Sequence, residues 1–329
     1  MFTAVGAAPD VTGGRRSTGE GMGRLETVTG VLIPSKANSD AFPSGLDVHV
    51  WDSGDELPPD DVLERTECYV MPYTFAPDTG DIIGKLPNVK IVQTLTAGYE
   101  HVLPYLHDGL TLCNARGVHD ASTAELAVTL TLASLRGIPT FVEARAREEW
   151  AFGWYESLAD KTVLIVGYGA IGQAIESRLV PFECDVLRVA RTARDGVAGF
   201  DALPELVGRS DVIIVICPLT DETRGLVGKE FLARMRDGAL LVNVARGGIV
   251  DTDALVAELS EGRIRAALDV TDPEPPPPGH ALWHVPGLLM SPHVGGPTSA
   301  FWPRARRLVR DQLERYAAGE PLANVVITP

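Results

Sequence analysis

Residues 161–173, KTVLIVGYGAIGQ, predict the fold of the chain. They open with a β-branched apolar run, place three glycines at G-x-G-x-x-G spacing, and end in a helical pattern; the glycines are Gly167, Gly169 and Gly172. A strand, a tight turn and a helix in this order are what a dinucleotide-binding turn requires. The glycines permit the bend, the approach of a pyrophosphate and close helix packing, and the start of the helix favours phosphate. The alternative, a glycine-rich loop without a ligand, does not account for the flanking strand and helix.

The composition is that of a globular protein with more than one domain. The chain has 329 residues, of which 45% are hydrophobic and 22% charged. No apolar run has transmembrane length. The formal net charge of −15 argues against non-specific binding to nucleic acid and against docking on an anionic membrane. Residues 1–27 lack a signal-peptide core and are interpreted as a disordered extension.

The cysteines indicate a reducing compartment. None of the four forms a C-x-x-C pair, and most lie in or beside apolar runs: Cys68, Cys113, Cys184 and Cys217. We interpret them as small buried hydrophobic residues. The sequence therefore predicts a cytoplasmic protein with no disulfide and no metal site.

The first third of the chain predicts a small α/β domain. Short helical pieces at 60–65 and 82–86 alternate with apolar runs at 28–33, 48–51, 68–71, 89–92 and 110–113. Such alternation is typical of parallel βαβ units.

Two segments connect this region to the glycine turn. Residues 123–136 predict a helix that is apolar on most sides, with Ser122 as its N-cap and Glu125 completing a capping box. Such a helix is expected to be buried between two domains or two subunits. Residues 141–159 carry mixed charge, contain Phe141, Trp150, Phe152 and Trp154 among their aromatic residues, and predict an arm leading into the central strand.

The second half predicts a complete dinucleotide-binding sheet. Together with the strand at 163–166, six strands are expected; the other five lie at 186–189, 212–216, 240–244, 264–268 and 288–290. An amphipathic helix follows at 303–318, with Pro303 at its start and Gly319 at its end.

Residues that follow these strands are expected to meet at one edge, because ligands of open parallel sheets bind beyond the carboxyl ends of the strands. They are Arg191, Cys217, Pro218, Ala245, Arg246, Gly247, Asp269 and His293. An arginine can hold a carboxylate through a bidentate pair, and a histidine can give a proton to a carbonyl oxygen as hydride arrives. A carboxylate beside the histidine would orient it. The combination suits reduction of a keto acid.

Three blocks carry a family resemblance. Residues 241–251 (LVNVARGGIVD), 266–275 (AALDVTDPEP) and 291–296 (SPHVGG) resemble, in order and spacing, the D-isomer-specific 2-hydroxyacid dehydrogenase family. The resemblance covers roughly residues 28–329. It implies two Rossmann-like α/β domains with doubly wound parallel sheets, a catalytic cleft, and a homodimer paired through the larger domains.

The resemblance also implies the domain boundaries. Residues 28–118 and 299–329 are expected to form a discontinuous substrate domain closed by the C-terminal helix. Residues 119–298 are expected to form the dinucleotide-binding domain, including the dimerisation arm.

Site residues follow from the same resemblance. It implies that Arg246 binds the substrate carboxylate and carbonyl, that Glu274 pairs with the catalytic histidine, and that His293 is the acid/base. Substrate contacts are expected at Ala97, Gly98, Tyr99, Arg246 and His293. Cofactor contacts are expected at Gly167, Gly169, Ala170, Ile171, Gly172, Arg191, Thr192, Arg194, Cys217, Pro218, Thr223, Val244, Ala245, Arg246, Asp269, His293 and Gly295.

Each of the central assignments has a structural alternative. Arg246 can cap a strand end or pair with Asp251, and Glu274 can be a solvated loop charge. His293 can be a structural histidine, and Asp269 can cap a strand end instead of holding the nicotinamide.

The cofactor is expected to be NADP, with NAD as the alternative. An acidic residue about 20 positions after the glycine turn normally binds the ribose hydroxyls of NAD. Here the strand ends at Arg191, with Thr192 and Arg194 beside it. Arginine pairs with a 2′-phosphate, which an acid repels. Alternatively, Arg191 stacks over the adenine and Asp195 contacts the ribose.

The expected activity is reduction of glyoxylate or hydroxypyruvate to a D-hydroxy acid with NADPH. One alternative is an NAD-dependent phosphoglycerate-type dehydrogenase, for which basic residues near the small-domain loops are few. Another is a non-catalytic, nucleotide-sensing corepressor. Aromatic residues are expected either to narrow the substrate pocket or to lie in a core or interface: Tyr73, Phe75, Tyr99 and Trp302.

Overall fold

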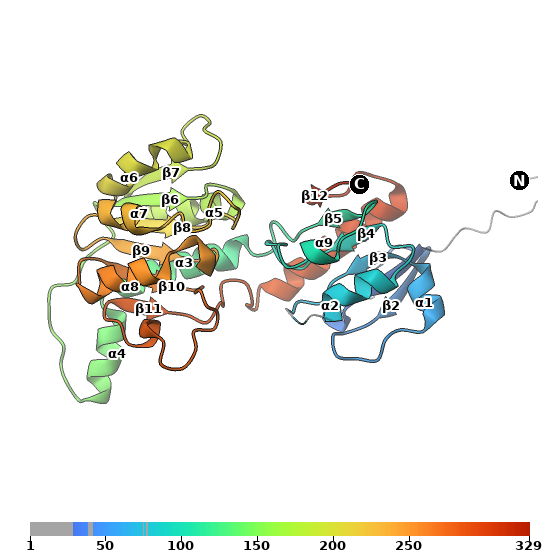
Figure 1. Ribbon diagram of the computed structural model, residues 1–329, viewed down its shortest axis with the longest axis horizontal. Helices are drawn as coiled ribbons and strands as arrows, with labels where there is room; N and C mark the ends of the chain where they lie inside the picture. The colour runs from blue at the N-terminus through green and yellow to red at the C-terminus, as the bar shows by residue number, and fades with distance from the viewer. Residues whose placement is uncertain (1–28, 39–41, 75, 77) are drawn as a thin grey trace, which may run out of the picture.

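The chain folds into two α/β lobes, each built on a six-stranded sheet (Figure 1). The structure is a computed structural model and describes residues 29–38, 42–74, 76 and 78–329. The predicted extension at 1–27, the first residue of the run at 28–33, and Phe75 lie outside the described residues.

The first sheet has the strand order β12-β5-β4-β3-β1-β2. Its parallel strands are β1 (Thr29–Ile33), β2 (Leu46–Val50), β3 (Thr66–Val70), β4 (Ile91–Gln93) and β5 (Thr111–Cys113). Each falls within or beside one of the five apolar runs, which confirms that part of the prediction. The helical pieces are α1 (Asp60–Arg65), the one-turn α2 (Asp78–Asp81) and a 3₁₀ helix (Ile82–Lys85).

The second sheet is entirely parallel, with the order β11-β10-β9-β8-β6-β7. Its strands are β6 (Thr162–Val166), β7 (Asp185–Val189), β8 (Val212–Val215), β9 (Leu240–Asn243), β10 (Arg265–Leu268) and β11 (Leu288–Met290). All six predicted strands are therefore present. Since β7 and β8 lie on opposite sides of β6, the glycine turn that follows β6 is at the switch point of the sheet, where ligands of doubly wound folds bind.

Both faces of the second sheet are covered by helices. In β6, Leu164 and Val166 join the apolar core on one side of the sheet, and Val163 and Ile165 join the core on the other. Successive strand residues point to opposite faces, so a strand buried on both sides has a continuous apolar sequence. The helices of this lobe are α3 (Asp120–Leu135), α5 (Ala170–Leu179), α6 (Leu203–Arg209), α7 (Lys229–Arg234) and α8 (Thr252–Ser260).

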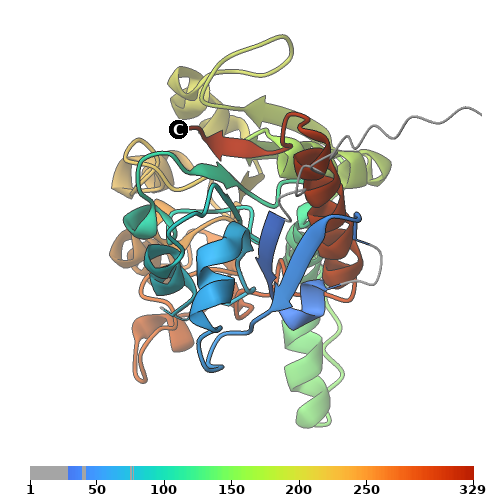
Figure 2. The same ribbon diagram turned by 90° about the vertical axis from the view of Figure 1, so that its right-hand side faces the viewer.

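The C-terminal helix α9 (Phe301–Ala318) returns the chain to the first lobe, as the resemblance implied (Figure 2). Its buried residues Phe301, Val309 and Leu313 share an apolar core with β1 and β3. After the left-handed residue Gly319, β12 (Val325–Ile327) pairs antiparallel with β5. Sequence reasoning missed β12, because its three residues find a partner only after α9 has brought them beside β5.

The predicted capping box of the apolar helix is wrong. Helix α3 begins at Asp120, its N-cap is His119, and no side chain caps it. Ser122 lies inside the helix, where its hydroxyl is 2.7 Å from that of Thr298 on the chain segment leading to α9. A tertiary contact therefore uses the side chain that the local pattern assigned to the cap.

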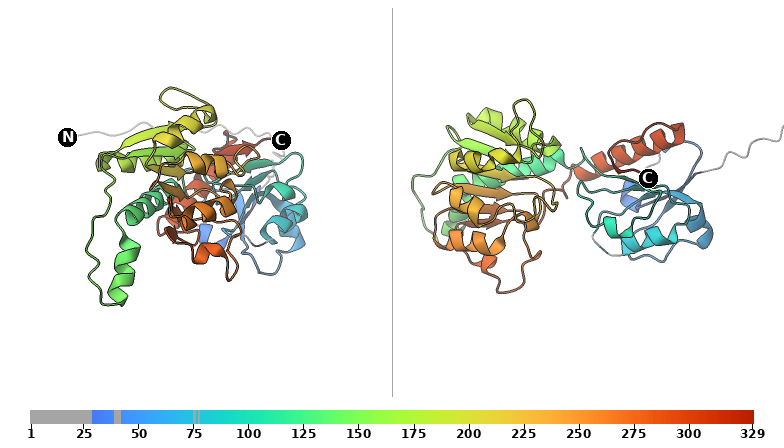
Figure 3. Two further views of the ribbon diagram at one scale, coloured as in Figure 1. Left: turned by 60° about the vertical axis from the view of Figure 1, so that its left-hand side comes forward. Right: turned by 45° about the horizontal axis from the view of Figure 1, so that its top comes forward.

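The predicted arm consists of helix α4 (Ile138–Ala146) and an extended segment, and α4 projects from the second lobe (Figure 3). Three aromatic side chains of the segment lie in solvent: Trp150 is 93% exposed, Phe152 85% and Trp154 101%. A fourth, Tyr155, packs against Phe141 of α4. Among the described residues no single helix is long and apolar enough to cross a membrane; α3 and α4 together pass by length and composition only, and they bend by 62°.

We propose to divide the chain where these two sheets separate. The substrate domain would comprise residues 28–118 and 299–329, and the dinucleotide-binding domain residues 119–298. The proposal is supported by α3, which leaves the first sheet after β5, and by α9, which returns to it.

Candidate active site

The glycine turn has the geometry of a pyrophosphate site. Gly167 has φ +108°, and a Cβ there would lie 2.4 Å from the backbone nitrogen of Cys217. At Gly172 a Cβ would lie 2.9 Å from the carbonyl oxygen of Gly167. A Cβ at Gly169 would instead project into open space at the start of α5. The first N–H groups of a helix have no partner within it, so Ala170 and Ile171 present donors there. These residues fit a dinucleotide.

The edge of β7 is cationic. Arg191, Thr192 and Arg194 are all exposed beyond the end of this strand, as is Asp195. Arg194 donates a hydrogen bond to the carbonyl oxygen of Tyr168, within the glycine turn. The residues predicted to choose the cofactor therefore lie next to the turn predicted to hold its pyrophosphate.

Further predicted cofactor contacts follow β8 and β9 on the same edge of the sheet. Cys217, Val244 and Ala245 are buried. The hydroxyl of Thr223 donates to the carbonyl oxygen of Pro218 at 2.7 Å and accepts from the N–H of Thr220 at 2.8 Å. Thr223 thus shapes the loop after β8, and its contact with a cofactor remains a prediction.

The structure brings together the predicted histidine and glutamate. Nδ1 of His293 lies 2.5 Å from Oε1 of Glu274, and the other carboxylate oxygen accepts from the N–H of Thr271 at 3.2 Å. Burial raises the pKa of Glu274, but the hydrogen bond and charge of His293, the Thr271 N–H and the charge of Arg246 outweigh burial and lower it. The carboxylate is therefore ionised beside the ring, which it orients through Nδ1.

Asp269 builds the loop that carries the histidine. Its side chain is buried. One carboxylate oxygen accepts hydrogen bonds from the hydroxyl of Ser291 at 2.6 Å and from the N–H of Val294 at 2.9 Å. The other oxygen accepts a hydrogen bond from the N–H of Gly295 at 2.9 Å. These bonds hold His293 in a left-handed conformation, with φ 54°. These bonds are those expected if Asp269 caps the end of a strand, which was the structural alternative for this residue. Its predicted contact with the nicotinamide remains a prediction.

Arg246 reaches from the second lobe to the predicted carboxylate loop of the first. Its Nη1 donates to the carbonyl oxygen of Ala245 at 2.7 Å, and a Cβ added to Gly98 would lie 1.8 Å from its Nη2. A side chain at position 98 would therefore displace the guanidinium from its place against this loop. The loop is held by the Asn114 side chain, which donates to the carbonyl oxygen of Ala97 at 2.7 Å.

Glu100 is a charged neighbour that sequence reasoning missed. Its Oε2 lies 3.8 Å from Nη2 of Arg246, and the two side chains are 36% and 35% exposed. The only feature of the sequence that pointed to this contact was the position of Glu100, two residues after Gly98. That signal is weak, because an acidic side chain in a loop is usually solvated.

Tyr73 belongs to a cluster of aromatic rings with Phe301 and His119. The ring of Tyr73 lies 4.4 Å from that of Phe301 and 5.8 Å from that of His119 (centroid distances). His119 is buried, and its Nε2 lies 2.8 Å from the carbonyl oxygen of Leu95. Tyr73 and Trp302 pack against the core beneath α9, which favours the core alternative for both, and Tyr99 packs against the opposite core of the first lobe.

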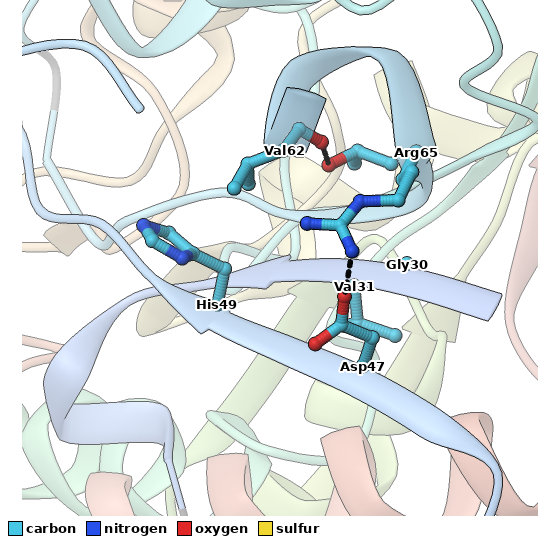
Figure 4. A pocket seen from close by; sticks show the side chains of 7 residues that line it. Gly30, Val31, Asp47, His49, Val62 and Arg65 are labelled. Atoms are coloured by element: carbon cyan, nitrogen blue, oxygen red, sulfur yellow. Dashed lines mark hydrogen bonds and ion pairs between the residues drawn. The ribbon is translucent and has the colours of Figure 1, made fainter. Parts of the chain in front are cut away.

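A small pocket elsewhere in the first lobe contains none of the predicted site residues (Figure 4). It lies between β1, β2 and α1, where Nη1 of Arg65 pairs with Asp47 at 3.0 Å.

The fold and this site define a two-domain oxidoreductase that binds a nicotinamide dinucleotide. A family model described as "D-isomer specific 2-hydroxyacid dehydrogenase, NAD binding domain" matches residues 128–295. The human glyoxylate reductase/hydroxypyruvate reductase is 33% identical over 306 residues, which are 86% of this chain and 91% of the relative. The chain belongs to the D-isomer-specific 2-hydroxyacid dehydrogenase family, and it is an NAD(P)-binding oxidoreductase acting on 2-keto or 2-hydroxy acids.

Two further comparisons bear on cofactor and substrate. The Xanthobacter autotrophicus Py2 family member solved with NADPH and MES superposes with a TM-score of 0.76 at 30% identity, covering 91% of this chain and 98% of the other. The D-3-phosphoglycerate dehydrogenase of Methanocaldococcus jannaschii is 34% identical over 264 residues, which are 76% of this chain but only 50% of the relative. Neither the phosphoglycerate-type nor the corepressor alternative is favoured by these relationships.

Replacing Glu274 with glutamine should lower kcat by about 10²-fold, because an amide cannot stabilise the imidazolium that takes part in proton transfer. Steady-state kinetics with saturating substrate would measure this. The matched control is Glu258→Gln, which breaks an ion pair with Arg263 away from the site and should leave kcat unchanged. A Glu274→Gln enzyme with wild-type kcat would contradict the role of the pair.

The same variant tests the pKa of Glu274. Because the pKa of this carboxyl is lowered from its ordinary value of 4.5 in the folded protein, its ionised form stabilises the fold. That contribution is fully present above the ordinary value and is lost as the pH falls through the lower, folded value. We expect the difference in unfolding free energy between wild type and Glu274→Gln to be largest near neutral pH and to shrink in acid. Denaturant titrations at about pH 7 and about pH 3.5 that gave the same difference would contradict this.

Proposed function

We propose that this protein is an NADPH-dependent reductase that converts a small 2-keto acid, glyoxylate or hydroxypyruvate, into the D-2-hydroxy acid. The observation that carries the proposal is the hydrogen-bonded pair of His293 and Glu274 on the same sheet edge as Arg246, which lies against Gly98. One catalytic pair and one carboxylate-binding group suit a short keto acid. The human relative is named for these two substrates.

The roles follow from the geometry. When bound, the nicotinamide supplies the hydride that reduces the carbonyl carbon. Arg246 and the backbone at Ala97 and Gly98 hold the substrate carboxylate, and the arginine also polarises the carbonyl. His293 gives its proton from Nε2 to the carbonyl oxygen, because Nδ1 faces Glu274. Glu274 orients the ring and stabilises its charged form before the proton leaves.

The preference for NADPH is supported by the exposed Arg191 and Arg194 beside the turn and by the lack of an acid at the end of β7. Arginine pairs with the 2′-phosphate that distinguishes NADP from NAD. The similar Xanthobacter protein is described as a complex with NADPH.

The test is oxidation of NADPH and of NADH, followed by loss of nicotinamide absorbance, with glyoxylate, hydroxypyruvate, pyruvate and a bulky aromatic keto acid. We expect rapid oxidation of NADPH with one of the small acids and weak activity with NADH. Activity with NADH alone would overturn the cofactor preference and keep the reductase. No activity with any of the four acids, despite nucleotide binding, would contradict the substrate class.

We also propose that the protein forms a homodimer that pairs through the arm. We further propose that it is located in the cytoplasm. The dimer is supported by Trp150 and Trp154, since exposed aromatic residues close together are typical of interfaces. The cytoplasm is supported by the four free cysteines, three of them buried. Light scattering should give twice the chain mass for wild type and the single mass for Trp150→Ala/Trp154→Ala. Trp283→Ala, at another exposed tryptophan, is the matched control and should remain dimeric.

A further inference from the structure

Four side chains form a network between the glycine turn and the edge of β7. Tyr168, between the first two glycines of the turn, donates its hydroxyl to Glu176 of α5. Nε of Arg188, in β7, lies 2.9 Å from each oxygen of Glu176, and its Nη2 donates to the same carboxylate. Arg194 donates to the carbonyl oxygen of Tyr168. Of these four residues, only Arg194 was predicted to contact the cofactor.

The network fixes the position of Tyr168. The backbone N–H of Tyr168 donates to the carbonyl oxygen of Val189 at 2.8 Å, which ties the turn to the end of β7. Glu176, whose side chain is only 13% exposed, fixes the other end of the tyrosine through the hydroxyl. The hydrogen bond from Arg188 lowers the pKa of Glu176, and burial together with Glu176 raises the pKa of Tyr168. The acceptor is therefore an ionised carboxylate and the donor a neutral phenol.

The ring in turn restrains Arg194. The guanidinium carbons of Arg188 and Arg194 each lie 5.8 Å from the centroid of the Tyr168 ring, within the range of cation–π interactions. Arg194 is otherwise exposed, and a free arginine side chain loses rotamer entropy when it binds a ligand. Contacts with the ring and the carbonyl oxygen of Tyr168 restrict the side chain before any ligand arrives.

The charges of the network divide the arginines into two kinds. The charge of Arg188 is neutralised by Glu176, which occupies its guanidinium. Within the part of the chain that the structure describes, the guanidinium of Arg194 donates to a neutral carbonyl oxygen and is paired with no carboxylate, so its charge is not neutralised. Among the described residues, Arg191 makes no hydrogen bond or ion pair, so it has no partner that fixes its position. The turn therefore presents one positioned cation, Arg194, and one exposed cation without such contacts among the described residues, Arg191.

We propose that Tyr168 is a positioning residue for phosphate specificity: it holds Arg194 where the guanidinium pairs with the 2′-phosphate of the bound nucleotide, and the Glu176–Arg188 pair holds Tyr168. The inference rests on the proposed preference for NADPH. It adds that a residue of the glycine turn itself contributes to this preference. It accounts for a tyrosine at a turn position whose hydroxyl, ring and carbonyl oxygen are all engaged.

The test is calorimetric titration with two probes, adenosine 2′,5′-bisphosphate and AMP, which differ only in the 2′-phosphate. We expect wild type to bind the bisphosphate at least about tenfold more tightly. Tyr168→Leu should lose most of that ratio and keep its affinity for AMP. Tyr168→Phe, which retains the ring but not the hydroxyl, and Glu176→Gln should lose part of it. Tyr168→Leu/Arg194→Ala should lose no more than Arg194→Ala alone, because the tyrosine acts through the arginine.

The outcomes separate this inference from the proposed function. If wild type binds both probes equally, the preference for NADPH is wrong, and the inference is wrong with it. If wild type prefers the bisphosphate and Tyr168→Leu keeps the full ratio, only the inference is overturned. Equal weakening of both probes in Tyr168→Leu would mean that the tyrosine only supports the turn, and would also overturn it. A lower ratio with unchanged affinity for AMP supports it.

Discussion

Replacing His293 with alanine should lower kcat by about 10³-fold, within the range that a positioned general acid contributes. The reason is local: the imidazole held 2.5 Å from Glu274 is the group that we assign to protonate the carbonyl oxygen. Stopped-flow oxidation of NADPH at saturating keto acid would measure the loss. Nucleotide affinity, measured by calorimetry, should change little, because the glycine turn and the edge of β7 are untouched.

The control for this experiment is His284→Ala. His284 is exposed and precedes β11, whereas His293 follows that strand. Its replacement removes a histidine but leaves the pair of His293 and Glu274 intact. It should retain wild-type kcat. A His293→Ala enzyme with unchanged turnover would refute the acid/base assignment, and a folded variant that no longer bound nucleotide would point to a role of His293 in the cofactor site.

The second large effect is expected at Arg246. Replacing it with lysine should lower kcat/KM by about 10²-fold, because lysine keeps the charge but loses the planar fork that binds a carboxylate through two hydrogen bonds. Gly98→Ala should have an effect of similar direction, since its methyl carbon would lie 1.8 Å from Nη2 and would displace the guanidinium. Steady-state kinetics over a range of keto acid concentrations would separate effects on KM from effects on kcat.

The matched control is Arg236→Lys. Arg236 pairs with Asp211 at 2.8 Å, just before β8, at the end of the sheet opposite the site. This conservative change should leave kcat/KM as in wild type. A fully active Arg246→Lys enzyme would show that no bidentate contact is made, and a fully active Gly98→Ala enzyme would show that the contact between Arg246 and the loop is absent during catalysis.

Much of the site was predictable because its residues follow strands. Arg246 and His293 come after β9 and β11, and a parallel sheet brings the carboxyl ends of its strands to one edge. The pairing of His293 with Glu274 required the family resemblance, since Glu274 lies in a proline-rich loop with no periodic pattern. The cofactor turn was predicted from the glycine spacing together with the strand before it and the helix after it, and a Cβ at Gly167 or Gly172 would indeed meet the backbone of the turn and of the loop after β8.

Other features have no local signal. Ser122 fits a capping box by pattern, yet its hydroxyl makes a hydrogen bond with the hydroxyl of Thr298 instead. His119 is buried beside Tyr73 and Phe301, which come from distant parts of the chain. Strand β12 pairs with β5 from more than 200 positions away, which no window of sequence can indicate.

The sequence by itself determined the parallel strands of both sheets, the glycine turn and the identity of the residues at the sheet edge, since periodicity and glycine spacing act over a few residues. Only the tertiary structure decided which of those residues meet. The contact of Arg246 with Gly98 joins the two lobes. Around Tyr168, one arginine, Arg188, pairs with a carboxylate, whereas another, Arg194, contacts only the carbonyl oxygen and the ring of the tyrosine among the described residues and keeps its charge. Such distinctions between identical side chains arise from packing and burial, which are properties of the folded chain.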